Sequence, residues 1–416
     1  MIFRFGIREL GKHRLITRMN LLLIIMTFVT GIFCVSIILY QYRFYHAVDT
    51  LTDSQGVFVL TEGLMTDDGS DYVKNNEELE NLLPGITVSS FRYGSMQCSI
   101  NSQQSDSYQN IIYDDKIVRA FTPQLEEGSW FTADSSDTQI EAVVSASTKG
   151  IHVGDKLKIM EDKNQIGEVV VIGVLKDGAE AIGRSNNFDA ITGFSYRNMY
   201  ANYSAENEKP TIFLSQSNLN KVQKSQGKEL IASELTGGIF IQYKNEFTDE
   251  EKEDCYSYVS SHIIAGGDQL INFSDIHQNS KAYFRDIIMQ QVPIFLCVFI
   301  VTVISVICIE IISFKMSLRD FAIYCICGCS KRDIQMIQVF EIMILTVLSF
   351  FISGLFIWYC TWAKFIDGGV IWIGAYQIIY CLLVALIMLG ISSWIPAYLW
   401  KKSSSNELLR LTSDRK

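Results

Sequence analysis

Residues 317–341 read SLRDFAIYCICGCSKRDIQMIQVFE and stand between two long apolar segments. Charged residues lie at both ends and apolar residues in the middle, which predicts a short amphipathic helix. Gly328 breaks this pattern, and Ser330 follows it, three residues before Asp333, where a carboxylate favours the start of a helix. We therefore predict a helix, a turn, and a second helix that is capped by Ser330 and Asp333 and enters a membrane.

Four apolar blocks determine the class of protein. The blocks span residues 19–40, 292–314, 337–360 and 370–400. Each block is longer than the stretch of about 20 residues that a helix needs to cross a bilayer. Hydrophobic residues make up 49% of the 416 residues, and their clustering indicates a membrane protein. The predicted fold class is a membrane protein with four transmembrane α-helices and a large α+β extracytoplasmic domain between helices 1 and 2.

The domain boundaries follow from these blocks. The predicted parts are a cytoplasmic amphipathic helix at 1–18, transmembrane helices at 19–42, 287–314, 337–360 and 370–400, an extracytoplasmic domain at 43–286, a cytoplasmic coupling loop at 315–336, a short outer loop at 361–369 and a cytoplasmic tail at 401–416. The outer domain is expected to have stalk helices at both ends, in which the helices continue past the membrane and carry the domain.

The charges orient the chain. Residues 43–286 hold 20 Lys and Arg against 37 Asp and Glu, which leaves 15 basic and 8 acidic residues elsewhere. Basic flanks favour the cytoplasmic side, so both termini are predicted inside and the acidic domain outside the plasma or inner membrane of the cell. An acidic domain also argues against nucleic acid as a partner.

The outer segment has the patterns of both strands and helices. Alternating apolar residues with Gly or Asp at the turns predict strands at 57–60, 140–144, 156–160 and 169–174. Helical spacing predicts helices at 75–83, 217–235 and 249–264, the last of them capped by Thr248.

The cysteines and histidines give no clear metal site. Cys98 and Cys255 are the two cysteines of the outer segment; they form either a disulfide, if this segment faces an oxidising space, or two buried thiols, which is the more ordinary state. The cluster Cys325, Cys327 and Cys329 has no fourth ligand nearby, so we expect no metal there.

Two acids fall within the apolar blocks, Glu310 and Glu341, both near a cytoplasmic end. An ionisable residue inside a membrane is a candidate for an ion or proton pathway. Their position near the membrane boundary favours interfacial hydrogen bonding instead.

The chain offers no convincing nucleotide site of its own. Residues 178–185, GAEAIGRS, come near the phosphate-binding loop pattern, but Arg184 replaces the lysine that contacts the outer phosphates. The segment is also predicted to lie outside, where nucleotide is scarce. We therefore expect no enzyme activity in this chain.

The order of the parts resembles the FtsX-like/MacB-like permeases of mechanotransmission ABC systems. The residues that carry the resemblance are GIRELGKHR at 6–14, LEEGSWF at 125–131, VGDKLKI at 153–159, VIGVL at 171–175, RDFAIYCICGCSKRDI at 319–334 followed by Glu341, IPA at 395–397 and NELLR at 406–410. Relative to the family pattern of the cytoplasmic loop, Asp320 is one carbon shorter than the usual Glu, and Ile326 is bulkier than the usual alanine.

The resemblance implies partners and a coupling site. It implies two cytoplasmic ABC ATPase subunits that bind ATP and Mg, a second permease subunit that is identical or homologous, and the lipid bilayer. The ATPase would bind this chain as a helix is held in a groove, at Arg319, Asp320, Phe321, Ile323, Tyr324, Ile326, Gly328, Ser330, Lys331 and Arg332.

Three tasks are compatible with such a subunit. The first is export or removal of an antimicrobial peptide or another amphipathic compound. The second is signalling, in which the moving outer domain activates a partner such as a cell-wall hydrolase. The third is release of lipoproteins from the membrane.

Overall fold

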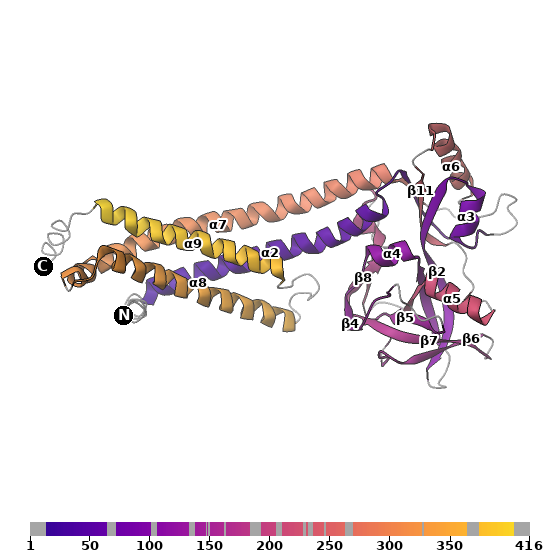
Figure 1. Cartoon of the computed structure of the whole chain (residues 1–416), viewed down its shortest axis with the longest axis horizontal. Coiled ribbons are helices and arrows are strands. Elements are labelled where there is room, and N and C mark those ends of the chain that lie inside the picture. Colours follow the sequence, from indigo (N-terminus) through magenta and orange to yellow (C-terminus); the bar gives the residue numbers. More distant parts are fainter. Residues whose placement is uncertain are drawn as a thin grey trace. The chain divides into compact units, whose positions relative to one another are not determined.

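The computed structural model divides into two compact units, Tyr42–Arg285 and a helical unit made of Met1–Gln41 with Asp286–Lys416 (Figure 1). The structure describes residues 14–64, 72–100, 106–132, 138–146, 148, 150–161, 164–183, 193–204, 210–227, 230–231, 236–244, 247–262, 269–326, 328–363 and 374–402. Of the helix predicted at 1–18, residues 1–13 lie outside the described residues and residues 14–18 belong to helix α2. Residues 403–416 of the predicted tail and residues 364–369 of the predicted outer loop also lie outside the described residues. The first unit, Tyr42–Arg285, differs by one residue at each end from the outer domain predicted at 43–286.

Long helices make up the helical unit. They are α2 Arg14–Leu51, α7 Phe273–Ile326, α8 Lys331–Trp362 and α9 Ala375–Lys402. Three segments of them are long and apolar enough to cross a membrane, namely Arg14–Leu51, Phe273–Ser317 and Arg332–Trp362, and a shorter apolar helix spans Ala375–Ile391. Within the described residues the chain thus has three to four apolar helices where the sequence predicts four spans.

Polar side chains join these helices inside the helical unit. Thr27 Oγ1 of α2 donates to Thr302 Oγ1 of α7 at 2.7 Å, and Gln377 Nε2 of α9 donates to Ser36 Oγ at 3.1 Å. Around them pack buried apolar residues of all four helices, including Phe28. Such hydrogen bonds between helices are favoured in a bilayer because no water competes for the polar groups.

Helix α7 is longer than a membrane is thick. Its 54 residues correspond to about 80 Å, against a hydrocarbon core of about 30 Å. The helix continues through Pro293 and through most of the predicted coupling loop at 315–336, and it ends only at Ile326. No glycine or proline interrupts residues 294–326, which explains why the amphipathic segment continues the membrane helix instead of forming a separate one.

The unit Tyr42–Arg285 is built on one sheet with the strand order β12-β1-β11-β2-β3-β10-β5-β7-β4 among the described residues. The strands are β1 Gly56–Thr61, β2 Ile86–Ile100, β3 Asp106–Tyr113, β4 Leu125–Gly128, β5 Ile140–Val144, β6 Lys156–Glu161, β7 Asn164–Leu175, β10 Thr211–Ser215, β11 Gly237–Tyr243 and β12 Gln269–Asn272, with a separate hairpin of β8 Ala179–Ile182 and β9 Tyr200–Tyr203. The four predicted strands are confirmed.

Strand β6 closes part of the sheet into a ring. It pairs with the end of β2 on one side and with β7 on the other, so that β2, β3, β10, β5, β7 and β6 follow one another in a circle. Apolar side chains from these strands form one core, which includes Ile112, Val144, Leu157 and Leu214. A second core lies where β1, β11 and the start of β2 meet the helices α3 Asn76–Leu82 and α6 Asp249–Ser261.

The short helices follow their capping residues. Thr248 forms a capping box with Glu251 at the start of α6, as predicted. Helix α5 spans Gln216–Gln226 and is shorter than the predicted 217–235, because Gly227 adopts φ +63° and ends it. The predicted extension therefore does not continue α5.

Of the two states that the sequence leaves open for Cys98 and Cys255, the structure has the two buried thiols, and both are free. Cys98 belongs to the core of the ring and Cys255 to the second core, so different sets of side chains surround them. Burial raises the pKa of Cys98 to about 12 and that of Cys255 to about 11, because a thiolate would lose its hydration there.

Candidate functional sites

The turn between α7 and α8 is defined by two caps. At the end of α7 the backbone N–H of Cys329 donates to Tyr324 O at 2.9 Å, and Gly328 between them has φ +95°. This is a Schellman cap, in which glycine is favoured because it alone takes positive φ without steric cost. The turn thereby ends a helix that other residues would have allowed to continue.

Helix α8 begins with the capping box that the sequence predicts. Ser330 Oγ accepts from the Asp333 N–H at 3.2 Å, and Asp333 Oδ2 accepts from the Ser330 N–H at 2.9 Å. Two backbone donors that the helix leaves unpaired are satisfied in this way. The turn at residues 328–330 is therefore held from both sides by local hydrogen bonds.

The apolar residues of the predicted coupling site differ in their exposure. Phe321 is only 2% exposed and lies against Phe314, with ring centroids 5.9 Å apart. Ile323 is 48% exposed, and Tyr324 is half-buried. The accessible apolar surface of this segment is therefore centred on Ile323, whereas Phe321 packs inside the helical unit and cannot meet a partner without rearrangement.

The polar residues of the predicted site lie around this surface. Asp320 is half-buried, and Gly328, Ser330 and Arg332 are exposed. For Arg319, Ile326 and Lys331 the structure describes the backbone alone, so their side chains lie outside the described part of the chain.

The two acids predicted at the membrane boundary take different positions. Glu310 of α7 is 6% exposed, and Glu341 of α8 is half-buried. Their carboxyl groups are close enough for electrostatic interaction. Glu310 is thus packed within the helical unit. The sequence instead favours a position at the lipid–water boundary for this residue.

The end of α2 is fastened to strands of its own unit by Arg43 and Phe44. The guanidinium of Arg43 donates to the carbonyl of Thr122 and lies 5.0 Å from the ring centroid of Phe121. Phe44 is 2% exposed and packs edge-on against Tyr200, with centroids 4.6 Å apart. Tyr200 in turn donates its hydroxyl to Phe44 O at 3.0 Å.

A charged pair covers the same ring of Phe44. The guanidinium carbon of Arg197 lies 5.7 Å from the ring centroid, and Arg197 is paired with Glu180 of strand β8. The Glu180 side chain is only 8% exposed. Because the carboxylate of Glu180 is largely removed from water, it holds Arg197 over the ring more firmly than an exposed carboxylate would.

The start of α7 is fastened to the end of α2. His277 Nδ1 lies 3.0 Å from Asp49 Oδ1, and its Nε2 lies 2.6 Å from Thr52 O. The ring of Tyr45 on α2 also stacks on the ring of Phe284 on α7, with centroids 5.2 Å apart. Both helices that enter this unit are therefore bound to each other as well as to the sheet.

Helix α7 also contacts the segment before β9. Ser280 Oγ accepts from the Tyr196 N–H at 2.8 Å, and Asn279 Nδ2 donates to Phe194 O at 3.2 Å. We call the contacts of Arg43, Phe44, Tyr200, Arg197, Glu180, His277, Asp49 and Ser280 the stalk joint.

Comparisons with known proteins find similar chains among solved structures. No family model and no curated protein matches the chain. Among solved structures, the extracellular domain of the noncanonic ABC-type transporter YknZ from Gram-positive bacteria is 14% identical and covers 52% of this chain and 99% of that one, with a TM-score of 0.29. The periplasmic region of MacB from Actinobacillus actinomycetemcomitans is 13% identical and covers 53% of this chain and 90% of that one, with a TM-score of 0.28.

These neighbours are an extracellular domain and a periplasmic region, and the chain covers 90% or more of each.

Sequence reasoning missed the stalk joint. A signal was present in residues 40–45, YQYRFY, where four aromatic residues gather at the end of an apolar block. Tyr200, His277 and Glu180 gave no such signal, because their partners are distant in the sequence. In the described residues, no group of three or more His, Cys, Asp or Glu side chains has the arrangement of a metal site.

Proposed function

We propose that this chain is the membrane subunit of an ABC transport system, in which a separate cytoplasmic ATPase moves the outer domain. The observation that carries the proposal is the continuity of α7, which runs from the stalk joint at its start to the capped turn at residues 328–330. A single helix can transmit a displacement along its axis because its backbone hydrogen bonds resist stretching. Helix α2 gives the outer domain a second such connection.

The ATPase is proposed to bind at the turn between α7 and α8. Ile323 supplies an exposed apolar side chain, and Arg332 lies near the end of the same turn as an exposed charge. An apolar anchor with a polar rim is the usual composition of a helix that docks into a groove. Two ATPase subunits, each binding ATP and Mg, and a second permease subunit complete the proposed complex.

The proposed orientation rests on charge. Both termini and the turn are basic and are proposed to lie in the cytoplasm, with four spans in the plasma or inner membrane. The acidic unit Tyr42–Arg285 is then extracytoplasmic. The net negative charge of that unit suits a cationic amphipathic substrate such as an antimicrobial peptide, because opposite charge raises the rate of encounter.

Binding of the ATPase is tested with Ile323→Asp in the full-length chain, purified with its ATPase and reconstituted in lipid nanodiscs. A charge in the apolar anchor should reduce copurification of the ATPase and its stimulated hydrolysis by about tenfold or more. Val153→Asp is the matched control, since Val153 is an apolar side chain that is 42% exposed but lies in the unit Tyr42–Arg285. Equal loss in both variants, or no loss in Ile323→Asp, would contradict the proposed site.

The export task is tested with the same reconstituted complex. A cationic amphipathic peptide should stimulate ATP hydrolysis in the wild type, and an anionic peptide of equal length should not. Stimulation by a purified cell-wall hydrolase, without any response to peptides, would favour the activator function instead.

A further inference from the structure

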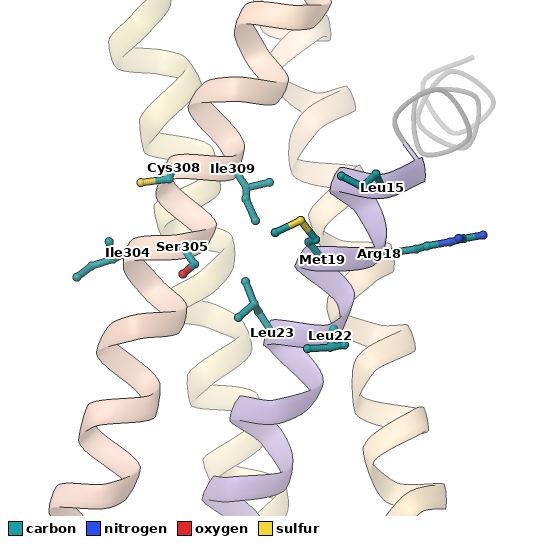
Figure 2. A pocket seen from close by; sticks show the side chains of 9 residues that line it. All are labelled: Leu15, Arg18, Met19, Leu22, Leu23, Ile304, Ser305, Cys308 and Ile309. Carbon is teal, nitrogen blue, oxygen red and sulfur yellow. The ribbon is translucent and has the colours of Figure 1, made fainter.

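An open groove lies between α2 and α7 within the helical unit (Figure 2). It measures about 560 Å³, which is in the range of about 300–1,000 Å³ typical of ligand pockets. Its walls are mostly apolar, with Leu15, Met19, Leu22 and Leu23 from α2 and Ile304 and Ile309 from α7. Figure 2 shows Met19, Leu23 and Ile309 pointing into the space between the two helices.

The groove opens where the contact between the helices ends. Thr27 and Thr302 join α2 and α7 by a hydrogen bond of 2.7 Å and are both buried. One to three turns closer to the start of α2, Leu22 is 61% exposed and Leu15 is 73% exposed, and Ile304 opposite them is 55% exposed. The apolar walls therefore remain uncovered by this chain's described residues and are available to a ligand.

Basic side chains stand at the edge of the groove. Arg18 is among the residues that line it, and Figure 2 shows its side chain extending from α2 on the side away from α7. Arg14 is exposed one turn earlier on the same side of the helix. No acidic residue is among those that line the groove.

This combination fits a lipid with a negatively charged headgroup. The apolar walls suit an acyl chain, and the planar guanidinium of Arg18 suits a phosphate, to which it can donate two hydrogen bonds. A packed helix would instead remove Arg18 from water without giving it an acceptor of matching charge, which is unfavourable. Anionic lipids are concentrated in the cytoplasmic leaflet, and basic pockets between membrane helices on that side bind their headgroups.

We propose that this groove binds one acyl chain of an anionic phospholipid from the inner leaflet, with the phosphate held by Arg18 and Arg14. The choice of the inner leaflet depends on the proposed orientation of the chain. The choice of an anionic headgroup does not depend on that orientation. Since α2 and α7 are also the two helices that enter the outer unit, a lipid between them biases the spacing of the elements proposed to move.

Lipid retention by the full-length chain tests the proposal. The chain is purified in detergent with equal amounts of phosphatidylglycerol and phosphatidylcholine that carry identical acyl chains, and bound lipid is counted by native mass spectrometry. We expect one retained phosphatidylglycerol and at least about tenfold less phosphatidylcholine. Arg18→Gln should lower phosphatidylglycerol retention about tenfold, because it removes the charged donor.

A second variant tests the apolar part of the groove. Ser305→Trp places a large side chain on the lining of α7 and should reduce retention of phosphatidylglycerol by a similar factor. The matched controls are Lys281→Gln, which removes an exposed positive charge near the start of α7, and Leu355→Trp, which changes a side chain that is 65% exposed on another helix. Both controls should retain lipid as the wild type does.

Several results would overturn the proposal. They are equal retention of the two lipids, unchanged retention in both Arg18→Gln and Ser305→Trp, and a lipid-free dimer that Ser305→Trp converts to a monomer, which would assign the groove to a subunit interface. Retention in detergent does not depend on which side of the membrane the groove faces. The orientation is tested separately, by labelling of Cys329 in sealed vesicles. A wrong orientation can therefore be distinguished from a failure of lipid binding.

Discussion

Gly31 marks a close approach of α2 to α9. A Cβ atom at this position would lie 1.8 Å from the hydroxyl oxygen of Tyr380, and Tyr380 itself donates to Thr27 O at 3.2 Å. No side chain can be added there unless the ring moves and loses this hydrogen bond. The glycine therefore determines how tightly the two helices pack.

We predict that Gly31→Ala destabilises the helical unit by about 1–3 kcal/mol, the usual cost of overpacking. Denaturation of the full-length chain by sodium dodecyl sulfate, followed by circular dichroism, measures the free energy of unfolding. Gly354→Ala is the control, because a Cβ at Gly354 meets no atom within 4 Å. That variant should be neutral or stabilised by up to about 1 kcal/mol; equal effects of the two substitutions would contradict the packing argument.

The buried thiols should be unreactive in the folded chain. Burial raises the pKa of Cys98 to about 12 and of Cys255 to about 11, so at pH 8 both remain protonated, and the thiolate forms only as the pH approaches those values. N-ethylmaleimide at pH 8 should therefore modify neither until the chain is denatured, while the exposed Cys297 and Cys308 react in detergent. Peptide mapping without reductant checks this, and a linked Cys98–Cys255 peptide pair would refute it.

At the scale of elements, the start of α8 depends on one side chain. Ser330→Ala removes the acceptor for the Asp333 N–H, at an expected cost of about 1 kcal/mol. Hydrogen exchange of the amides in the first turn of α8 should become about fivefold faster, because the free energy of local opening falls by that amount. Ser330→Asn keeps an oxygen acceptor and should exchange as the wild type does; equally fast exchange in both variants would show that the cap does not stabilise the turn.

Local signals predicted some elements well and failed at particular residues. The caps at Ser330 and Thr248 were readable, because each is formed by residues three apart in the sequence. The helical spacing of residues 217–235 predicts a helix longer than α5. Gly227, whose φ is positive, ends the helix earlier. The family resemblance places Phe321 on a partner surface, whereas its burial against Phe314 depends on how the helices pack.

For the whole molecule, the stalk joint is the place where a moving α2 would pull on the outer domain. Phe44→Ala removes the ring that packs against Tyr200 and Phe121, at a local cost of about 3–5 kcal/mol. We predict that peptide transport by the reconstituted complex falls at least about tenfold, whereas binding of the ATPase at the far end of α7 is unchanged. Both are measured on the same vesicles.

The control for this variant is Tyr42→Ala, which changes a side chain that is 46% exposed two residues earlier on α2. It should transport at nearly the rate of the wild type. Wild-type transport by Phe44→Ala would show that α2 does not act through this contact. Loss of ATPase binding in Phe44→Ala would instead indicate a general folding defect.

The sequence by itself determined the apolar helices, their charged flanks, the two helix caps and four of the strands, because each of these depends on residues that are neighbours along the chain. Tertiary structure decided the order of the strands, the ring that β6 closes, the burial of Phe321 and Glu310, and the stalk joint. Phe44 and Tyr200, for example, are 156 residues apart. Hydrophobic period and helix length are local properties, whereas the partner of a side chain across such a distance depends on how the whole sheet is paired.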